Sequence, residues 1–273
     1  MKKTIPTTIL AFAVLASPAA AQQMQVQTDA DWCRDGWHRD DDRDRDTHCE
    51  VRTVTLPATS SFDVNASPNG GIEVEAWDRD EIHVEAKVRT HARRDGEARE
   101  LAREIEIDVG RGRVDTNGPK RRDRGDGWSV SYRIRVPART DLDLTSTNGG
   151  IAVDGVRGQL ELRTTNGGLA LRDVAGDVRG RSTNGGITAT LTGRRWDGPG
   201  LDLQTTNGGI EMEIPAGYSA RLEAGSTNGG YDIDFPVTVE GRLNPRRLSA
   251  DLGEGGPTIR AITTNGGVRI RRG

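Results

Sequence analysis

The chain contains 273 residues, of which 33% are hydrophobic, 4% aromatic and 29% charged, with 35 glycines and a formal net charge of −3. So much glycine and so few aromatic side chains argue against an ordinary α/β enzyme packed around bulky residues. No segment after residue 21 approaches the roughly 18 to 20 apolar residues that span a bilayer, and the charges are too mixed for a nucleic-acid-binding face. The sequence therefore predicts a protein that neither spans a membrane nor binds nucleic acid.

Residues 1–21 have the composition of a secretory signal peptide. Lys2 and Lys3 supply the positive start, residues 9–16 an apolar stretch, and the alanines ending at Ala21 a small-residue cleavage site. We expect cleavage near Ala21 and a mature protein outside the cytoplasm, in the periplasm, secreted or at the cell surface.

Residues 22–50 form a polar, acidic segment that holds the only two cysteines, Cys33 and Cys49. An oxidising compartment favours a disulfide between them, and a bridge closing a loop of this size stabilises by roughly 3 kcal/mol. The alternative is a zinc site made with His38 and His48, but the four residues lack a Cys-x-x-Cys pattern. The sequence favours the disulfide, with no metal and no other cofactor.

Residues 51–137 form the irregular N-terminal part of the main domain, which continues to residue 273. Strands are expected within residues 51–88 and one short helix over residues 95–104, where Leu101 stands among charged residues. The stretch 110–127 is rich in arginine, aspartate and glycine, which predicts an exposed hairpin tip or a mobile loop. A further strand then leads to Pro137.

The tripeptide Asn-Gly-Gly recurs seven times and is the main signal in the sequence. Its copies begin at Asn69, Asn148, Asn166, Asn184, Asn207, Asn228 and Asn265. From the second copy onward they lie 18, 18, 23, 21 and 37 residues apart, and the long last step predicts a coil that lost its corner near residues 244–256. Alternating apolar residues flank the later copies, so each unit reads as strand, Asn-Gly-Gly corner, strand.

Stacked units of this kind pair equivalent strands about 4.8 Å apart and bury their apolar residues in one continuous core. We predict an all-β fold, with a β-solenoid like a parallel β-helix over residues 138–273 and two-strand coils of about 18 to 23 residues. Asn-Gly tolerates positive φ, and the second glycine lets neighbouring corners approach closely. The competing architecture is a sandwich of antiparallel hairpins, whose turns have no reason to be identical. The N-terminal part and the arginines of the final strand are expected to cover the two ends.

Strand alternation divides the residues near each corner between two faces. We expect the corner asparagines and the hydroxyl residues two positions before them to point inward, each bonded to its copy in the next coil. These inward hydroxyl residues are Ser146, Thr164, Ser182, Thr205, Ser226 and Thr263. The residues just before the asparagines point outward and are Thr147, Thr165, Thr183, Thr206, Thr227 and Thr264. This outer threonine ladder is a candidate binding edge for carbohydrate or ice, although strand propensity and ladder packing also explain it.

Candidate catalytic residues are few. The remaining outward positions carry mixed charges, which predicts salt-bridged, solvated faces. A polysaccharide-cleaving groove would use a pair of acidic residues, and the candidates are Glu211 with Glu213 and Asp232 with Asp234. They occupy ordinary surface positions of strands, and the sequence therefore predicts no catalytic residue and no enzymatic activity.

Several segments occur here in a fixed order: the unit from Asn69 to Val74, the run from Trp77 to Glu81, a helix-containing insertion, a strand ending at Pro137, and serial Thr-Asn-Gly-Gly units. In this order they resemble the bacterial putative-adhesin domain family of unknown function. The resemblance covers residues 51–273. It implies an envelope-associated β-solenoid without established catalytic residues, and the adhesin name implies a surface interaction. We therefore expect adhesion or binding to a cell-envelope or surface glycan or protein. The alternatives are a polysaccharide-active enzyme on a solenoid groove and a purely structural envelope scaffold.

Overall fold

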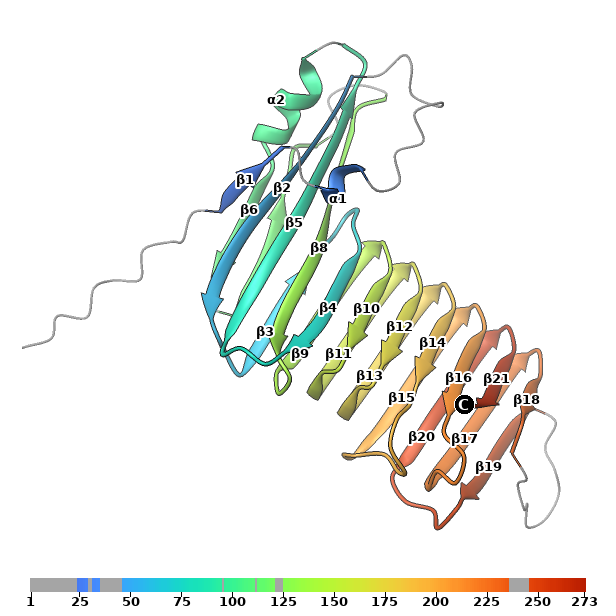
Figure 1. Ribbon diagram of the computed structural model, residues 1–273. Coiled ribbons are helices and arrows are strands. Elements are labelled where there is room, and N and C mark those ends of the chain that lie inside the picture. The colour runs from blue at the N-terminus through green and yellow to red at the C-terminus, as the bar shows by residue number, and fades with distance from the viewer. Residues whose placement is uncertain are drawn as a thin grey trace, which may run out of the picture.

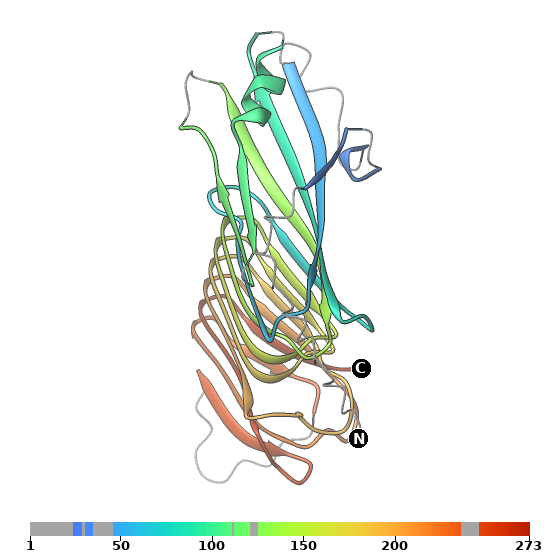
Figure 2. The ribbon, with the colours of Figure 1, turned by 90° about the vertical axis from the view of Figure 1, so that its left-hand side faces the viewer.

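The computed structural model describes residues 24–28, 31–34, 46–94, 96–110, 112–120, 125–235 and 246–273. Two long sheets face each other along a rod, which Figure 1 shows from the side and Figure 2 after a turn of 90°. The eleven-stranded sheet is here called sheet A and the ten-stranded sheet is called sheet B. The expected signal peptide lies outside the described residues. Within the described ranges, none of the helices has the length and apolar character needed to cross a membrane.

The repeat array forms the predicted β-solenoid. Each coil has a strand in sheet B, an Asn-Gly-Gly corner and a strand in sheet A. The sheet B strands of the coils are β9 (Asp141–Asn148), β11 (Arg157–Asn166), β13 (Ala175–Asn184), β15 (Gly200–Asn207), β17 (Ala220–Asn228) and β20 (Thr258–Asn265). The sheet A strands are β10 (Ile151–Asp154), β12 (Leu169–Arg172), β14 (Ile187–Thr190), β16 (Ile210–Ile214), β18 (Tyr231–Ile233) and β21 (Val268–Arg272).

Neighbouring coils pair in parallel and in register. Asn148 pairs with Asn166, Asn166 with Asn184, and Asn184 with Asn207. The asparagines thus stand in a column along one edge of the rod, as a solenoid requires. Antiparallel hairpins would have paired the two strands of one unit with each other, so the sandwich alternative is wrong.

The last coil lies between two earlier coils. β20 pairs with β15 on one side and with β17 on the other, while β21 pairs with β16 and β18. Between β18 and β20 in the chain, β19 (Arg247–Leu252) runs antiparallel to β17 at the edge of sheet B. The expectation of a coil that lost its corner near residues 244–256 is therefore wrong. The arginines of β21 lie inside the stack, so the expectation that they cover its end is also wrong.

The N-terminal part extends both sheets with mostly antiparallel strands. Sheet A begins with β1 (Gln25–Gln27), β2 (Asp46–Pro57), β5 (Glu81–Ala92) and β8 (Gly127–Pro137), and β4 (Ile72–Trp77) then connects it to the coils. Sheet B begins with β6 (Glu106–Gly110), β7 (Arg113–Asn117) and β3 (Ser61–Asn65). β6 and β7 pair antiparallel with Gly110 opposite Arg113, which agrees with the hairpin expected at the start of residues 110–127. The expected exposure is wrong for Val114 of β7, which is buried in the core.

The predicted short helix is present as α2 (Glu97–Arg103), which lies at the N-terminal end of the rod (Figure 1). Arg52 holds its C-terminal end by donating hydrogen bonds to the carbonyl oxygens of Ala102, at 2.7 Å, and Ile105, at 2.6 Å. A second short helix, α1 (Asp31–Arg34), was not predicted. The expected disulfide between Cys33 and Cys49 joins it to β2, with a Cα–Cα distance of 5.9 Å.

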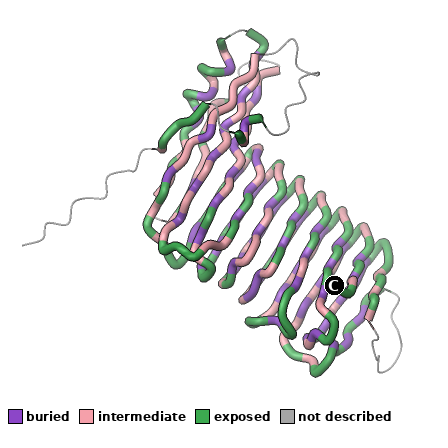
Figure 3. The backbone as a smooth tube through the Cα atoms, in the orientation of Figure 1, coloured by how far each residue is buried: buried purple, intermediate pink, exposed green. Residues whose placement is uncertain are grey.

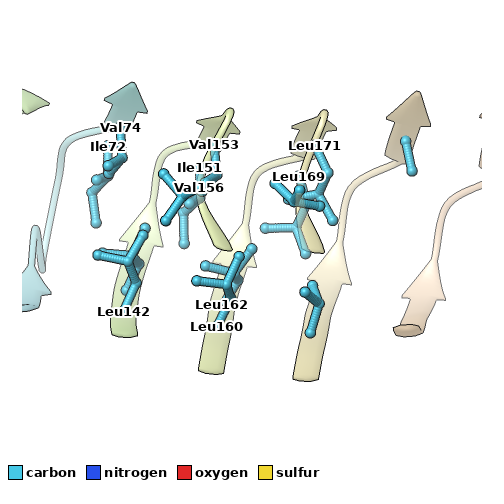
Figure 4. Packing of buried hydrophobic residues seen from close by; sticks show 14 of the residues in the cluster. Ile72, Val74, Leu142, Ile151, Val153, Val156, Leu160, Leu162, Leu169 and Leu171 are labelled. Carbon is cyan, nitrogen blue, oxygen red and sulfur yellow. The ribbon is translucent and has the colours of Figure 1, made fainter. Parts of the chain in front are cut away.

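The core is a double row of aliphatic side chains between the sheets. Along most strands of the coils buried residues alternate with more exposed ones, which Figure 3 shows as alternating colours. Leu160 and Leu162 of sheet B and Leu169 and Leu171 of sheet A all have side chains no more than 3% exposed. Figure 4 shows the two rows meeting between the sheets. Each coil repeats this packing, so the core continues along the rod as mostly aliphatic side chains, with Phe62, Tyr132, Trp196 and Tyr218 as buried aromatic members.

Candidate functional site

Neighbouring coils approach each other closely at the Asn-Gly-Gly corners. A Cβ atom built on the first glycine of a corner would lie 2.1 to 2.2 Å from the carbonyl oxygen of the first glycine in the adjacent coil, as it does at Gly167 and Gly185. A Cβ on the second glycine has more room, with its nearest atom at 3.4 Å in the case of Gly186. Among the described residues, Asp173 is the one non-glycine with positive φ. The expectation of positive φ is therefore wrong for the corner asparagines, but it holds for three first glycines, with φ values of 156° at Gly70, 158° at Gly229 and 151° at Gly266. At the other corners it is steric contact between coils that requires the first glycine.

The corner asparagines point outward, contrary to the expectation that they share the inner face. They are exposed, and each donates a hydrogen bond from Nδ2 to Oδ1 of the asparagine in the adjacent coil. The donor–acceptor distance is 2.8 Å between Asn166 and Asn148, and 2.9 Å between Asn184 and Asn166. The same bond joins Asn148 to Asn69, Asn207 to Asn184, Asn265 to Asn207 and Asn228 to Asn265. The result is a continuous amide ladder on the surface.

The inward hydroxyl residues are buried as expected, but their hydrogen bonds differ from the prediction. Each hydroxyl donates to the carbonyl oxygen of the first corner glycine in the adjacent coil. Thr164 bonds Gly149 at 2.8 Å and Ser182 bonds Gly167 at 2.9 Å. The hydroxyl therefore satisfies a backbone acceptor at the corner instead of its own copy in the next coil.

The outer threonine ladder lies on the outer face of sheet B, beside the amide ladder. Thr147 is half-buried and its hydroxyl is hydrogen-bonded to that of Ser67 at 2.9 Å. The remaining five members are exposed. Within the described part of the chain their hydroxyls make no hydrogen bond, so one donor and acceptor per coil is available to a ligand.

A shallow groove of about 490 Å³ runs along this ladder. Its other wall is the next outward column, which consists of Thr145, Arg163, Arg181, Gln204 and Ile262. This column was not predicted from the sequence as part of the site. It stands three residues before each asparagine, so the same alignment that revealed the threonines contains the signal for it.

Acidic residues neutralise the arginines of the groove. Arg163 contacts Asp143 at 3.1 Å and Glu161 at 3.0 Å. Arg181 contacts Asp202 at 3.1 Å with Nη2, whereas its Nη1 is buried without a partner among the described residues. Burial by itself would raise the pKa of Asp202, but hydrogen bonds from Gln204, Arg181 and Arg260 outweigh it and lower that pKa. The groove is therefore rich in hydrogen-bonding groups but close to neutral.

The two candidate acid pairs are not brought together. β21 lies between β16, which carries Glu211 and Glu213, and β18, which carries Asp232. Its Arg271 contacts Asp234 at 3.1 Å and Asp232 at 3.4 Å. The carboxylates of Asp232 and Asp234 therefore share one arginine as their ion-pair partner.

The residues of the proposed zinc site serve other contacts. Cys33 and Cys49 are joined in the disulfide, and His48 lies 3.0 Å from Glu50. His38 lies outside the described residues. Within the described ranges, no group of three or more histidine, cysteine or acidic side chains is arranged to hold a metal ion.

A second face, on the outside of sheet A, is lined by the exposed second glycines of the corners. Depressions of about 590 and 550 Å³ follow this glycine column and meet at Gly186 and Thr188. Trp32 of α1 borders one end and is contacted by Lys87 and Arg133, whose cationic groups lie 4.6 and 4.3 Å from the ring centroid. The disulfide thus fixes an aromatic residue over sheet A, a position that the sequence analysis did not predict.

Residues 52–271 match the sequence model of a family described as Toastrack DUF4097. The chain belongs to the Toastrack family. The match confirms the resemblance seen in the Asn-Gly-Gly units, and the solenoid described above is the Toastrack fold in this chain. Among the curated proteins, none matches this Toastrack chain.

Several solved structures are similar to this Toastrack protein at low identity. A putative cell adhesion protein from Clostridium sporogenes is 12% identical, with 84% of this chain and 100% of that chain covered and a TM-score of 0.44. A putative adhesin from Bacteroides fragilis is 11% identical, with 81% and 96% covered and a TM-score of 0.35. A putative lipid binding protein from Parabacteroides distasonis is 10% identical, with 81% and 96% covered and a TM-score of 0.41. At these values the likeness carries no functional argument.

Proposed function

We propose that this Toastrack protein is a non-enzymatic binding protein that acts outside the cytoplasm, in adhesion or in association with the cell envelope. The groove along the outer threonine ladder is the proposed contact surface, and a surface glycan is the proposed ligand. The signal-peptide pattern and the Cys33–Cys49 disulfide support the compartment.

One observation carries the proposal. Five hydroxyls without partners among the described residues stand in adjacent coils, and the in-register strands space them about 4.8 Å apart. Thr165, Thr183 and Thr206 lie in consecutive coils on strands that their neighbours hold on both sides. A rigid row of this kind loses little side-chain entropy on binding and offers the same hydrogen bond repeatedly. A linear polymer with hydroxyl groups at regular intervals is the ligand that such a row fits.

The test is binding of the mature protein to a glycan array and to purified envelope polysaccharide. Valine replaces threonine without a change of shape, so Thr165→Val, Thr183→Val and Thr206→Val together remove three hydroxyls and leave the fold intact. We expect an affinity loss of about 100-fold, because each hydrogen bond contributes about 1 kcal/mol.

The control is Thr188→Val with Thr190→Val, which makes the same kind of substitution at two positions on the outer face of sheet A and should leave binding unchanged. Equal loss in both variants would place the ligand elsewhere. Failure of the unmodified protein to bind any component would favour the structural scaffold.

The non-enzymatic part of the proposal has its own test. The protein is incubated with the polysaccharides that it binds, and the products are analysed for shortened chains. We expect none. Cleavage that disappears in Glu211→Gln or Asp234→Asn would overturn the proposal and establish the polysaccharide-active alternative.

A further inference from the structure

The last coil, residues 258–272, packs out of chain order. It occupies a slot between the coil of β15 and β16 and the coil of β17 and β18. By contrast, the described coils with corners from Asn148 to Asn207 follow chain order, since each coil after the first pairs with the coil directly before it. The slot therefore has two walls contributed by earlier parts of the chain, and the outer wall is joined to the parallel stack through the coil that fills the slot.

Charge matches the coil to its slot in three rows. In sheet B, Arg260 stands between Asp202 at 3.0 Å and Glu223 at 3.7 Å. In sheet A, the other two rows follow from the strand register. Arg269 pairs with Glu211 on one side and Asp232 on the other, and Arg271 stands between Glu213 and Asp234.

Without the inserted coil the two walls would repel each other. If the two walls paired directly in the same register, each of the three outward rows would bring two acidic residues face to face. These pairs would be Asp202 with Glu223, Glu211 with Asp232, and Glu213 with Asp234. Like charges directly opposite in neighbouring strands are destabilising. The apolar and corner patterns of the two walls are alike and do not prevent their direct pairing, so the acidic rows are what reserve the slot for a basic coil.

The same recognition extends through the corner and the end of the coil. Asn265 donates to Asn207 and accepts from Asn228, both at 2.7 Å. Thr263 donates to the carbonyl oxygen of Gly208 at 2.8 Å. The guanidinium of Arg272 lies 5.5 Å from the ring centroid of Phe235.

The coil enters the slot through a glycine-rich turn. Gly253, Gly255 and Gly256 have φ values of 55°, 72° and 138°, in the region that favours glycine. This turn connects β19 to β20, and it is the hinge at which the coil would swing out of its own slot.

We propose that the slot is an exchange site and that its alternative occupant is the coil 258–272 of a second copy of this chain. Two copies exchange their last coils reciprocally, and each slot then holds the same arginines, asparagine and threonine as before. Because the contacts are the same in both states, protein concentration and the conformation of the hinge decide between monomer and exchanged dimer.

Disulfide trapping in the full chain distinguishes the two states. Gln204 and Ile262 are register partners across the slot, so a Gln204→Cys/Ile262→Cys variant forms a bond within one chain in the monomer and between chains in the exchanged dimer. Arg181 and Gln204 are partners outside the slot, and Arg181→Cys/Gln204→Cys is the control. Both variants are refolded from denaturant over a range of concentrations, oxidised and separated under non-reducing conditions.

We expect a covalent dimer that increases with concentration in the slot variant and only intrachain bonds in the control. Intrachain bonds alone in both variants, at all concentrations, would overturn the proposal. If the two cysteines introduced across the slot failed to bond with each other at all, the proposal would also be overturned, since the slot depends on that pairing.

Charge exchange tests the recognition itself. One variant carries Arg260→Glu, Arg269→Glu and Arg271→Glu, and the other replaces the six slot acids by lysine. Each variant alone opposes like charges, whereas a reciprocal heterodimer restores all three rows in both slots. We expect heterodimers when the two are refolded together and none from either alone. Two separate species after joint refolding would contradict the exchange.

Neither experiment involves a glycan, so the outcome is independent of the proposed binding function.

Discussion

At the scale of single residues, the structure gives each position of the Asn-Gly-Gly corner a separate task. The asparagine forms the surface amide ladder, the first glycine admits the backbone of the adjacent coil, and the second glycine leaves an exposed floor. The recurrence of the tripeptide was visible in the sequence. The reason for its glycines was not, because contact between coils depends on residues 18 or more positions away.

The two glycines of one corner should therefore respond differently to alanine. A Cβ atom at Gly185 would lie 2.1 Å from the carbonyl oxygen of Gly167, whereas one at Gly186 would lie 3.4 Å from its nearest atom. We expect Gly185→Ala to lower the free energy of unfolding by roughly 3 kcal/mol, because backbone must move apart. Gly186→Ala should stay within about 0.5 kcal/mol of the unmodified protein. Urea denaturation of the two variants measures the difference, and equal effects would contradict the steric explanation.

Glu50 should make stability depend on pH at the N-terminal end of the rod. Burial would raise the pKa of this carboxyl group, but hydrogen bonds from His48 and Arg52 outweigh burial and hold the pKa below its ordinary value of 4.5. A lowered folded-state pKa stabilises the protein fully above the unfolded value, and the gain is lost as the pH falls through the folded value.

We expect Glu50→Gln to cost roughly 1 to 3 kcal/mol near neutral pH, with the difference from the unmodified protein vanishing in acid. Denaturation at a series of pH values measures this. The control is Glu73→Gln, whose side chain is 62% exposed beside Arg133 and should change stability little. If the difference in unfolding free energy between Glu50→Gln and the unmodified protein persisted unchanged in acid, the charge of Glu50 would not be what stabilises the protein.

At the scale of elements, the alternation of apolar and polar residues was enough to predict the strands of each coil and their parallel stacking. It was not enough to place the asparagines. They follow the outward threonines at the point where the chain leaves sheet B, so the strict two-residue period that places residues inward ends before them. Nor did it give the coil order, because the apolar patterns of the last coils are interchangeable and only their charges distinguish them.

Coils should be removable as whole units. Deletion of residues 145–162 joins Leu144 to Arg163 at equivalent positions and preserves the alternation. In the shortened protein Asp143 takes the position of the deleted Glu161, so an acidic residue still pairs with Arg179. We expect a protein that unfolds cooperatively, with a melting temperature lowered by no more than roughly 10 °C.

The matched control deletes residues 145–161 and joins Leu144 directly to Leu162. One additional residue within a strand turns one side of the junction to the opposite face. Circular dichroism during heating should show loss of the cooperative transition in this variant only. Similar melting of both variants would mean that register does not hold the coils together.

At the scale of the whole molecule, the rod is nearly one-dimensional, since each coil contacts mainly its two neighbours. The recurring Asn-Gly-Gly tripeptide was enough to predict a solenoid. The N-terminal part was less predictable because its strands pair antiparallel over long separations and show no repeat. The groove was predicted on one side only, since its second wall varies in side-chain type from coil to coil.

Stability should fall from the middle of the rod toward the C-terminal end, where β18 has only three residues and forms the edge of sheet A. Equivalent corner amides provide a matched comparison. The N–H of Gly167 donates to the backbone carbonyl of Asn184 inside the stack. The N–H of Gly266 donates to the backbone carbonyl of Asn228, which belongs to the coil of β17 and β18 at the end of the rod. We expect slower hydrogen exchange at Gly167, because terminal units open without disturbing central ones. Equal protection at both amides would show that the rod unfolds as one unit.

The amide ladder gives the rod a direction. Every corner asparagine donates toward the N-terminal end of the stack, where Asn69 in turn donates to the carbonyl oxygen of Trp128 at 3.3 Å. At the opposite end Asn228 has an Oδ1 atom that accepts nothing from the described residues. The head of the ladder thus ends on a backbone carbonyl and its tail is an open acceptor, so a further asparagine stacked in the same orientation would donate to Asn228.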